Sequence, residues 1–187
     1  MDDQQSRRIE VVPYDPSWPY IFEQLRERIW PAIHDLALTI EHVGSTSVPG
    51  LAAKPIIDMD IVVAAVESVP VVIERLKPLG YAHRGNLGIA GREAFASPVG
   101  LPEHHLYLCP QDSLALRNHL TLRDYLRSRP EAAQAYGALK QRLAAEHAYD
   151  IDGYVADKTD LIVGMLAEAG LSSDALEAIR RANKETA

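Results

Sequence analysis

The feature that most constrains the fold is an apolar run, residues 56–63, that carries two aspartates at alternating positions. Its length and its content of isoleucine and valine predict a single β-strand. Because side chains alternate between the two faces of a strand, Asp58 and Asp60 share one face, with Cα atoms about 6.5–7 Å apart. The apolar residues between them take the other face, which we expect to pack on the core.

The shared face of Asp58 and Asp60 predicts a metal site. Two ionised carboxylates side by side repel each other, and burying them without a partner is costly. A divalent cation removes both problems, and oxygen ligands of this kind suit Mg²⁺ or Mn²⁺, which take further ligands from phosphates. Two such ions about 3.5–4 Å apart can support an in-line phosphoryl or nucleotidyl transfer. We therefore predict both aspartates as catalytic metal ligands.

A small polar turn, residues 44–47, lies ahead of this strand, and twelve residues separate Ser45 from Asp58. Glycine lets backbone N–H groups approach an anion closely, and the neighbouring hydroxyl groups add donors. The turn is therefore interpreted as a phosphate-binding segment that uses Gly44, Ser45 and Thr46. Two alternatives stay open: the segment only reverses the chain, or the aspartates lie on an exposed face of an antiparallel sheet.

The periodicity of apolar residues divides the chain into two parts. Up to residue 110, helical spacing over 18–36 and 69–79 alternates with strand-like segments, and Pro31 is expected to kink or split the first helix. After residue 110 the pattern is nearly all helical. We predict an α+β fold: one domain over 1–187, with a core over 9–110 that is a mixed β-sheet flanked by helices, and a helical part over 111–187 packed on it.

The composition indicates a globular protein with an acidic surface. The chain is 47% hydrophobic and 24% charged, with a formal net charge of −7. Such a surface repels phosphate backbones, so stable nucleic-acid binding is not expected. The longest apolar run is too short to span a bilayer, residues 1–8 contain no apolar stretch, and the single cysteine, Cys109, fits a reducing compartment. We expect a cytoplasmic protein that does not enter membranes.

The Gly-Ser turn followed by Asp-x-Asp in an apolar strand resembles the signature of the polymerase-β-like nucleotidyltransferase superfamily. More narrowly, the chain resembles the GrpB family over about residues 9–168. This resemblance implies a nucleotidyltransferase-like fold, with Asp58 and Asp60 as metal ligands and Gly44 and Ser45 on the nucleotide phosphates. GrpB proteins also occur fused to dephospho-coenzyme A kinase, which implies a possible link to coenzyme A biosynthesis. The matching segments are 12–19 (VPYDPSWP), 40–61 (IEHVGSTSVPGLAAKPIIDMDI), 104–106, 122–127 (LRDYLR) and 154–158.

Active members of the superfamily usually carry a third carboxylate on a later strand, and the corresponding strand here, residues 104–108, contains none. Glu103 lies just before it. His105 points to the opposite face from His104, and a neutral imidazole near two carboxylates can act as a base or a ligand. We therefore name Glu103 and His105 as candidate catalytic bases, and a purely structural histidine stays an equal alternative.

Four basic residues are candidates for binding the triphosphate. A lysine contacts phosphate as a point charge, and an arginine matches it with two parallel hydrogen bonds. For the lysines the alternative is an exposed side chain, and for the arginines an exposed ion pair of little value. The candidates are Lys54, Arg92, Arg123 and Lys158.

The sequence thus predicts a Mg²⁺-dependent nucleotidyltransferase that moves a nucleoside monophosphate from a nucleoside triphosphate to a small acceptor. The first alternative is a non-catalytic accessory module on a degenerate transferase fold, which binds nucleotides or proteins. The second is a metal-dependent phosphohydrolase, because two-metal chemistry accepts water as readily as an alcohol.

Overall fold

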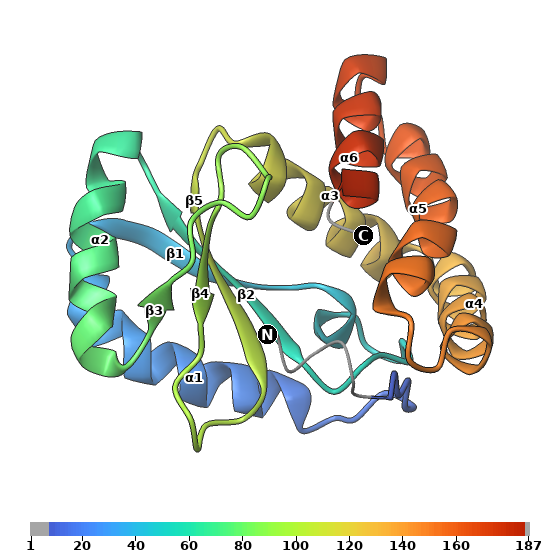
Figure 1. The fold of residues 1–187 in the computed structure, drawn as a ribbon, viewed down its shortest axis with the longest axis horizontal. Helices are drawn as coiled ribbons and strands as arrows, with labels where there is room; N and C mark the ends of the chain where they lie inside the picture. The colour runs from blue at the N-terminus through green and yellow to red at the C-terminus, as the bar shows by residue number, and fades with distance from the viewer. Residues whose placement is uncertain (1–7, 186–187) are drawn as a thin grey trace.

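The computed structural model describes residues 8–185, in which a five-stranded mixed sheet is joined to a group of helices (Figure 1). Residues 1–8, in which we noted no apolar stretch, lie mostly outside this described range. Three short 3₁₀ turns also occur, at Ser45–Ser47, Val66–Ser68 and Lys77–Leu79. The helices and strands are, in chain order, α1 (Trp18–Ile33), β1 (Ala37–Val43), β2 (Ile57–Val63), α2 (Val69–Leu76), β3 (Ala82–His83), β4 (Glu93–Ala96), β5 (His104–Pro110), α3 (Leu114–Ser128), α4 (Pro130–Glu146), α5 (Ile151–Glu168) and α6 (Ser173–Glu185).

The strand order is β1-β2-β5-β4-β3, and the only parallel pair in the described sheet is β2 with β5. The parallel register places Asp58 beside His105 and Asp60 beside Tyr107. β1 runs antiparallel to β2 and leads directly into the 44–47 turn. The two aspartates therefore lie near the middle of the sheet, next to the turn on one side and β5 on the other. The expected α+β architecture is confirmed.

The main core lies between the sheet and helices α1 and α2. Leu25 and Ile29 of α1 pack against β2 residues that include Met59, and Val72 of α2 joins the same cluster. The apolar face of β2 is almost completely buried, as the alternating pattern predicted. On the opposite face, α3 packs over the ends of β2 and β5 through a smaller cluster that includes Leu116. That face also carries the aspartates.

The expected split of the first helix at Pro31 is wrong, because α1 continues to Ile33 with Pro31 inside it, whereas the alternative, a kink, stays a prediction. Proline lacks an N–H and crowds the carbonyl four residues earlier, which is most disruptive in the middle of a helix. Here the helix ends two residues after the proline, so little helix remains to be displaced. By contrast, the segment with helical spacing over 69–79 does stop at its expected end, where Gly80 adopts the left-handed conformation with φ +91°.

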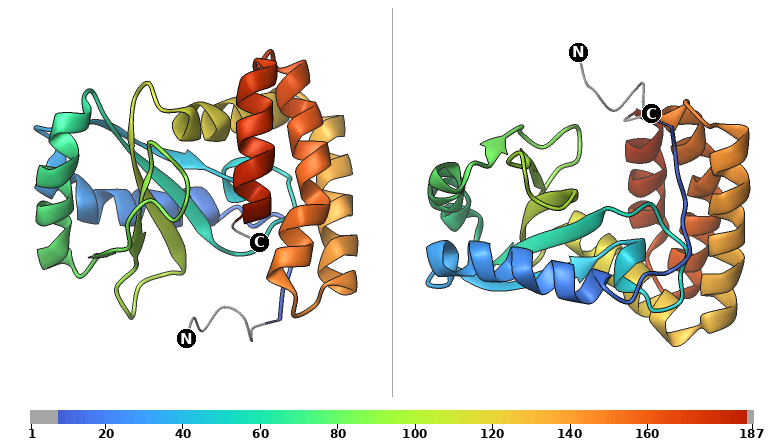
Figure 2. Two further views of the ribbon diagram at one scale, coloured as in Figure 1. Left: turned by 45° about the horizontal axis from the view of Figure 1, so that its top comes forward. Right: turned by 90° about the horizontal axis from the view of Figure 1, so that it is seen from below.

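Helices α4, α5 and α6 gather at one end of the molecule, beside the 44–51 segment (Figure 2). Val48 and Leu51 of that segment are buried among residues of the helical part. The N-terminal segment also connects the two parts: the Ile9 N–H donates to the carbonyl of Ala148, and Val12 forms a β-bridge with Ala53. Helices of the described residues are all too short or too polar to cross a membrane.

Candidate active site

Each of the two β2 aspartates is hydrogen-bonded by a histidine from a different element. Asp58 Oδ1 lies 2.9 Å from Nδ1 of His105 on β5, and Asp60 Oδ2 lies 2.8 Å from Nδ1 of His119 on α3. Asp60 is completely buried, whereas Asp58 keeps 28% of its side chain exposed. The strand that was predicted from alternation thus presents two carboxylate–imidazole pairs side by side.

Contacts between the aspartates and the histidines shift the pKa values of Asp58 and His119. Burial raises the pKa of Asp58, but the hydrogen bond and charge of His105, with help from His119 and Lys54, outweigh it and hold the pKa below its ordinary value. Burial lowers the pKa of His119, but Asp60 outweighs this by charge and hydrogen bonding and raises the pKa overall. The carboxylate of Asp58 is therefore stable as an anion at neutral pH.

One oxygen of this arrangement has no partner in the described structure. Asp60 Oδ1 is buried and accepts no hydrogen bond, which is costly for a carboxylate unless a cation or donor satisfies it. Asp58 Oδ2, next to Gly44, is the second oxygen that the histidines leave open. Within residues 8–185 no group of three or more acidic, histidine or cysteine side chains is arranged to hold a metal ion. Two open carboxylate oxygens still fit an ion that completes its shell with water and phosphate, as Mg²⁺ does.

The 44–47 turn approaches Asp58 closely. Gly44 has φ +67° and ψ −173°, a conformation that is essentially restricted to glycine, and a Cβ there would stand 2.9 Å from Asp58 Cβ and still closer to the carboxylate. Ser47 closes the turn by donating from Oγ to the Gly44 carbonyl at 2.6 Å. Arg127 of α3 donates to the Ser47 carbonyl from two nitrogens, at 2.8 and 3.0 Å. The turn is thus held rigidly against the carboxylate.

Thr46 is buried and points into the fold. Its Oγ1 lies 3.1 Å from Nε2 of His42 and donates to the Ile56 carbonyl at 3.3 Å. The His42 ring stacks on Phe22 with 4.7 Å between centroids, and burial lowers the pKa of His42 to about 4. The hydroxyl of Thr46 therefore holds the turn in place, while that of Ser45 is partly exposed.

Three lysines gather on the Asp58 side of the site. Lys54 and Lys158 both lie over the ring of Tyr154, with Nζ 5.9 and 4.8 Å from its centroid. Lys140 of α4 is only 3% exposed and its Nζ has no hydrogen-bond partner in the described structure. All three amines interact electrostatically with Asp58. Two segments from the helical part and one from the core therefore form a single basic cluster.

Burial and mutual repulsion weaken the charge of these lysines. Burial, with a contribution from Lys158, lowers the pKa of Lys140 to about 7, and burial, with a contribution from Lys54, lowers the pKa of Lys158 to about 8. Burial also lowers the pKa of Lys54, against the charge of Asp58. An anion bound among them would restore their charge, so the cluster is suited to phosphate groups.

The other predicted residues lie in different surroundings. Arg92 precedes β4 and is nearly buried, with its guanidinium carbon 4.4 Å from the centroid of Tyr107, on the Asp60 side. Arg123 is 12% exposed and donates from Nη1 to Glu41 at 2.7 Å and to the His42 carbonyl at 3.2 Å. Glu103 is exposed at the start of β5 and influences the charge of Lys54. The structure thus separates the two arginines from the lysine cluster.

Residues 8–168 match the family described as GrpB protein. The chain belongs to the GrpB family. It is 39% identical over 156 residues to UPF0157 protein YqkA of Bacillus subtilis, which covers 83% of this chain and 46% of YqkA, so the chain spans less than half the length of that relative. It is also 27% identical over 175 residues to a dephospho-CoA kinase of Mycolicibacterium paratuberculosis, which covers 80% of this chain and 43% of the kinase.

Solved structures support the same grouping. The GrpB protein of Enterococcus faecalis is 35% identical, and the match has a TM-score of 0.77 over 86% of this chain and 96% of that one. A chain of the GLD-2/RNP-8 complex matches with a TM-score of 0.51 and 18% identity, over 80% of this chain and 61% of that one, which shows likeness of fold alone. The chain therefore shares the fold of the Enterococcus faecalis GrpB protein and, more distantly, that of the chain in the GLD-2/RNP-8 complex.

Two residues of this GrpB site were missed by sequence reasoning. His119 lies in an amphipathic helix 59 positions after Asp60, and no local pattern links them. Lys140 follows Tyr136 by one helical turn and lies 4.6 Å from its ring centroid, and both are buried. The signal available in the sequence for Lys140 was its spacing, four residues after a tyrosine on a helix that faces the core.

Proposed function

We propose that this GrpB chain is a metal-dependent nucleotidyltransferase that moves a nucleoside monophosphate from a nucleoside triphosphate to a small acceptor. The observation that carries the proposal is that three lysines, of which Lys140 is buried, lie on the Asp58 side of the two β2 carboxylates. A carboxylate pair with open oxygens suits a divalent cation, and a cluster of amines beside it suits a polyphosphate. A ligand that carries both a metal ion and phosphates would account for the carboxylate pair and the lysine cluster together.

Asp58 Oδ2 and Asp60 Oδ1 would hold Mg²⁺ or Mn²⁺, which when bound polarises the α-phosphate and neutralises developing charge. Lys54, Lys140 and Lys158 would bind the β- and γ-phosphates and then the departing pyrophosphate. The backbone of the 44–47 turn would contact the phosphates from the other side, with Ser45 as the hydroxyl donor. Arg92, on the Asp60 side, would meet the α-phosphate or the acceptor.

His105 takes the place of the third carboxylate in this proposal. It lies in register with Asp58 and uses Nδ1 to reach it, so Nε2 is left to accept a proton from the acceptor. Glu103, which lies just before β5 and two residues before His105, is the second candidate for this role. Arg123 would support the site by holding β1 rather than by touching phosphate.

A specific observation favours a second candidate function, a binding module without turnover. β5 has no acidic residue facing the aspartates, and both aspartates already accept hydrogen bonds from histidines. Such a module would bind a nucleotide or a protein. A link to coenzyme A synthesis, proposed on the match to dephospho-CoA kinase, fits either function, and binding to nucleic acid is expected with neither.

The test begins with thermal unfolding of the chain with each nucleoside triphosphate and Mg²⁺ or Mn²⁺. Each 1 kcal/mol of ligand stabilisation should raise the melting temperature by roughly 2–4 °C for a chain of this size. The rise should disappear in the double variant Asp58→Asn/Asp60→Asn and persist in the control Asp112→Asn, which changes an exposed carboxylate. No metal-dependent rise in the wild type would refute nucleotide binding and favour a protein-binding module.

The product then separates the remaining possibilities. Pyrophosphate release that depends on an added acceptor supports the transferase, and orthophosphate release supports a phosphohydrolase. Metal-dependent nucleotide binding with no release under any acceptor condition would support the binding module.

A further inference from the structure

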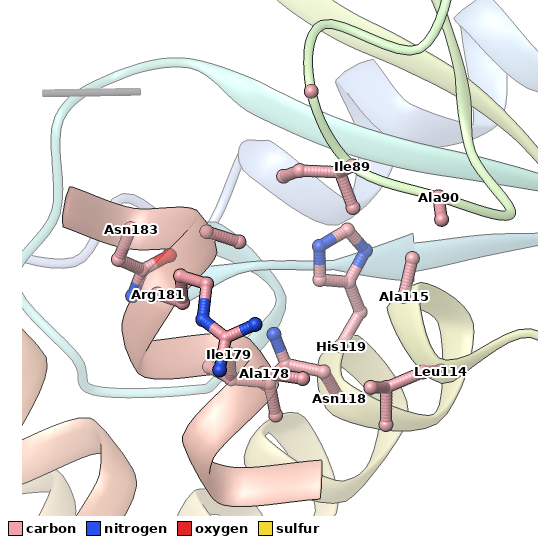
Figure 3. A pocket seen from close by; sticks show the side chains of 12 residues that line it. Ile89, Ala90, Leu114, Ala115, Asn118, His119, Ala178, Ile179, Arg181 and Asn183 are labelled. Atoms are coloured by element: carbon pink, nitrogen blue, oxygen red, sulfur yellow. The ribbon is translucent and has the colours of Figure 1, made fainter. Parts of the chain in front are cut away.

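A cavity of about 260 Å³ lies between the loop before β4, helix α3 and helix α6 (Figure 3). Ile89 and Ala90 of the loop lie above the ring of His119, and the α6 residues face it from the other side. None of the residues predicted from the sequence lines this cavity. It therefore requires an explanation of its own.

The lining combines apolar walls with a small polar part. Ile89, Leu114, Ala115, Ala178 and Ile179 supply methyl and methylene groups. Asn118 also lines the cavity, and its Oδ1 is buried with no hydrogen-bond partner in the described structure. A buried amide oxygen without a donor is costly, and a ligand N–H or O–H would satisfy it. This combination of apolar walls and a few polar groups is typical of sites for small molecules.

The cavity is connected to the aspartate pair through one side chain. His119 lines it and donates from Nδ1 toward Asp60 at 2.8 Å. The three lysines interact with the other carboxylate, Asp58. The cavity thus adjoins the Asp60 carboxylate through His119, whereas the lysine cluster adjoins Asp58.

We propose that this cavity binds the acceptor of the transfer, an inference that rests on the proposed function. In an in-line displacement the attacking and leaving oxygens lie on opposite sides of the phosphorus. If pyrophosphate leaves among the lysines beside Asp58, the acceptor hydroxyl arrives from the Asp60 side, where the cavity lies. The acceptor oxygen forms the new bond to the α-phosphorus, the bond to the bridging oxygen breaks, pyrophosphate departs, and the hydroxyl proton passes to Nε2 of His105, the base proposed above.

The lining defines the class of acceptor. The volume is slightly below the usual range for sites that take drug-sized ligands, so a small molecule fits and a polymer chain does not. The charged residue of the lining is Arg181, which already pairs with Glu177 at 3.1 Å. The acceptor is therefore a small alcohol with an apolar body and an N–H or O–H that donates to Asn118.

The probe is para-hydroxymethylbenzamide, which carries an apolar ring, a primary alcohol and an amide donor. Alanine-methyl NMR follows it directly, because Ala115 and Ala178 line the cavity and Ala37 belongs to the main core cluster, which contains no residue of the lining. We expect saturable shifts of the two lining methyl groups at millimolar probe, with Ala37 unchanged. The same shifts should occur when Mg²⁺ and a non-hydrolysable nucleoside triphosphate are present, because the two ligands occupy different sites.

Ala178→Leu fills the cavity from an exposed helical position and should weaken probe binding by about tenfold or more. The matched control is Ala167→Leu, the same change at an exposed position of α5 that does not line the cavity. Nucleotide binding should be unchanged in both variants, and their unfolding temperatures verify that both are folded. Equal probe affinity in the two variants would overturn the assignment.

Two further outcomes would also overturn the proposal. If no saturable shift occurs at the lining alanines, the cavity does not bind an alcohol of this class. If the nucleotide itself shifts these methyl groups and displaces the probe, the cavity holds the nucleoside instead of the acceptor. In both cases metal-dependent nucleotide binding that needs Asp58 and Asp60 would leave the proposed function intact, so the two failures can be told apart.

Discussion

Gly44 and Asp58 lie so close that no side chain fits between them: a Cβ on Gly44 would stand 2.9 Å from the Cβ of Asp58. The glycine is also in a conformation that other residues rarely adopt. The 44–47 turn and Asp58 are therefore one rigid unit. Their spacing in the sequence reflects a contact in space.

The first prediction concerns this contact. Gly44→Ala should destabilise the fold by about 2–4 kcal/mol, since strain at a glycine-only conformation adds to the displacement of Asp58. The control is Gly50→Ala, where φ is +79° but nothing lies within 4 Å of the new Cβ, so only the strain applies. Denaturant unfolding measures both variants. Equal losses in the two would show that the approach to Asp58 does not matter.

The second prediction concerns acid sensitivity. Burial lowers the pKa of His42 to about 4, so between pH 6.5 and 4 the unfolded chain binds a proton that the folded chain does not. Stability from this group is therefore complete above about pH 6.5 and is lost as the pH falls toward 4, by up to about 3 kcal/mol.

Unfolding free energies at several pH values in that window provide the measurement. His42→Gln should flatten the loss, whereas His34→Gln, at an exposed position, should leave it unchanged. An identical acid profile in the His42 variant would contradict the assignment of the loss to this ring.

The third prediction concerns the buried lysine. Because burial lowers the pKa of Lys140 to about 7, its charge is costly in the free protein, and Lys140→Met should raise stability at neutral pH. The same variant should weaken nucleotide binding by about tenfold or more, since it loses a charged phosphate contact. Lys77→Met, at an exposed ion pair with Glu74, is the control and should do neither. A stabilised variant with unchanged nucleotide affinity would exclude Lys140 from the phosphate site.

The fourth prediction separates two roles for Arg123. If it anchors β1 to α3 through Glu41, a double-mutant cycle of Arg123→Gln with Glu41→Gln should give a coupling of about 1–2 kcal/mol in unfolding. Nucleotide affinity of the folded Arg123→Gln variant should then stay near that of the wild type. Loss of affinity without any coupling would instead assign Arg123 to the triphosphate.

The parts of the structure that local pattern controls were predictable. Alternation along β2 gave the shared face of Asp58 and Asp60, and the sheet buries the other face as expected. Pro31 misled, because the effect of a proline depends on how far the helix extends beyond it, and that end is set by packing on the sheet. The strand and the shared face of its aspartates were thus visible locally, but the length of the helix was not.

The long-range parts of the site could not be predicted from the sequence. A lysine on an amphipathic helix ordinarily indicates an exposed position, and only the packing of α4 against the 44–51 segment buries Lys140. Arg92 and Lys54 were both candidates for phosphate binding, yet Arg92 packs on Tyr107 and Lys54 lies over Tyr154. The topology of the fold decides which of several basic residues lie together, and composition and spacing do not reveal it.

The pairing of β2 with β5 has a consequence for the order in which the chain acquires its chemistry. The imidazole partners of Asp58 and Asp60 come from positions 47 and 59 residues later. Contacts this distant in sequence form slowly, after shorter loops have closed. Until β5 and α3 dock, the aspartates of a nascent chain have no histidine beside them and no rigid spacing. The proposed metal binding would therefore require the finished fold, and a partly folded chain would present only two ordinary carboxylates.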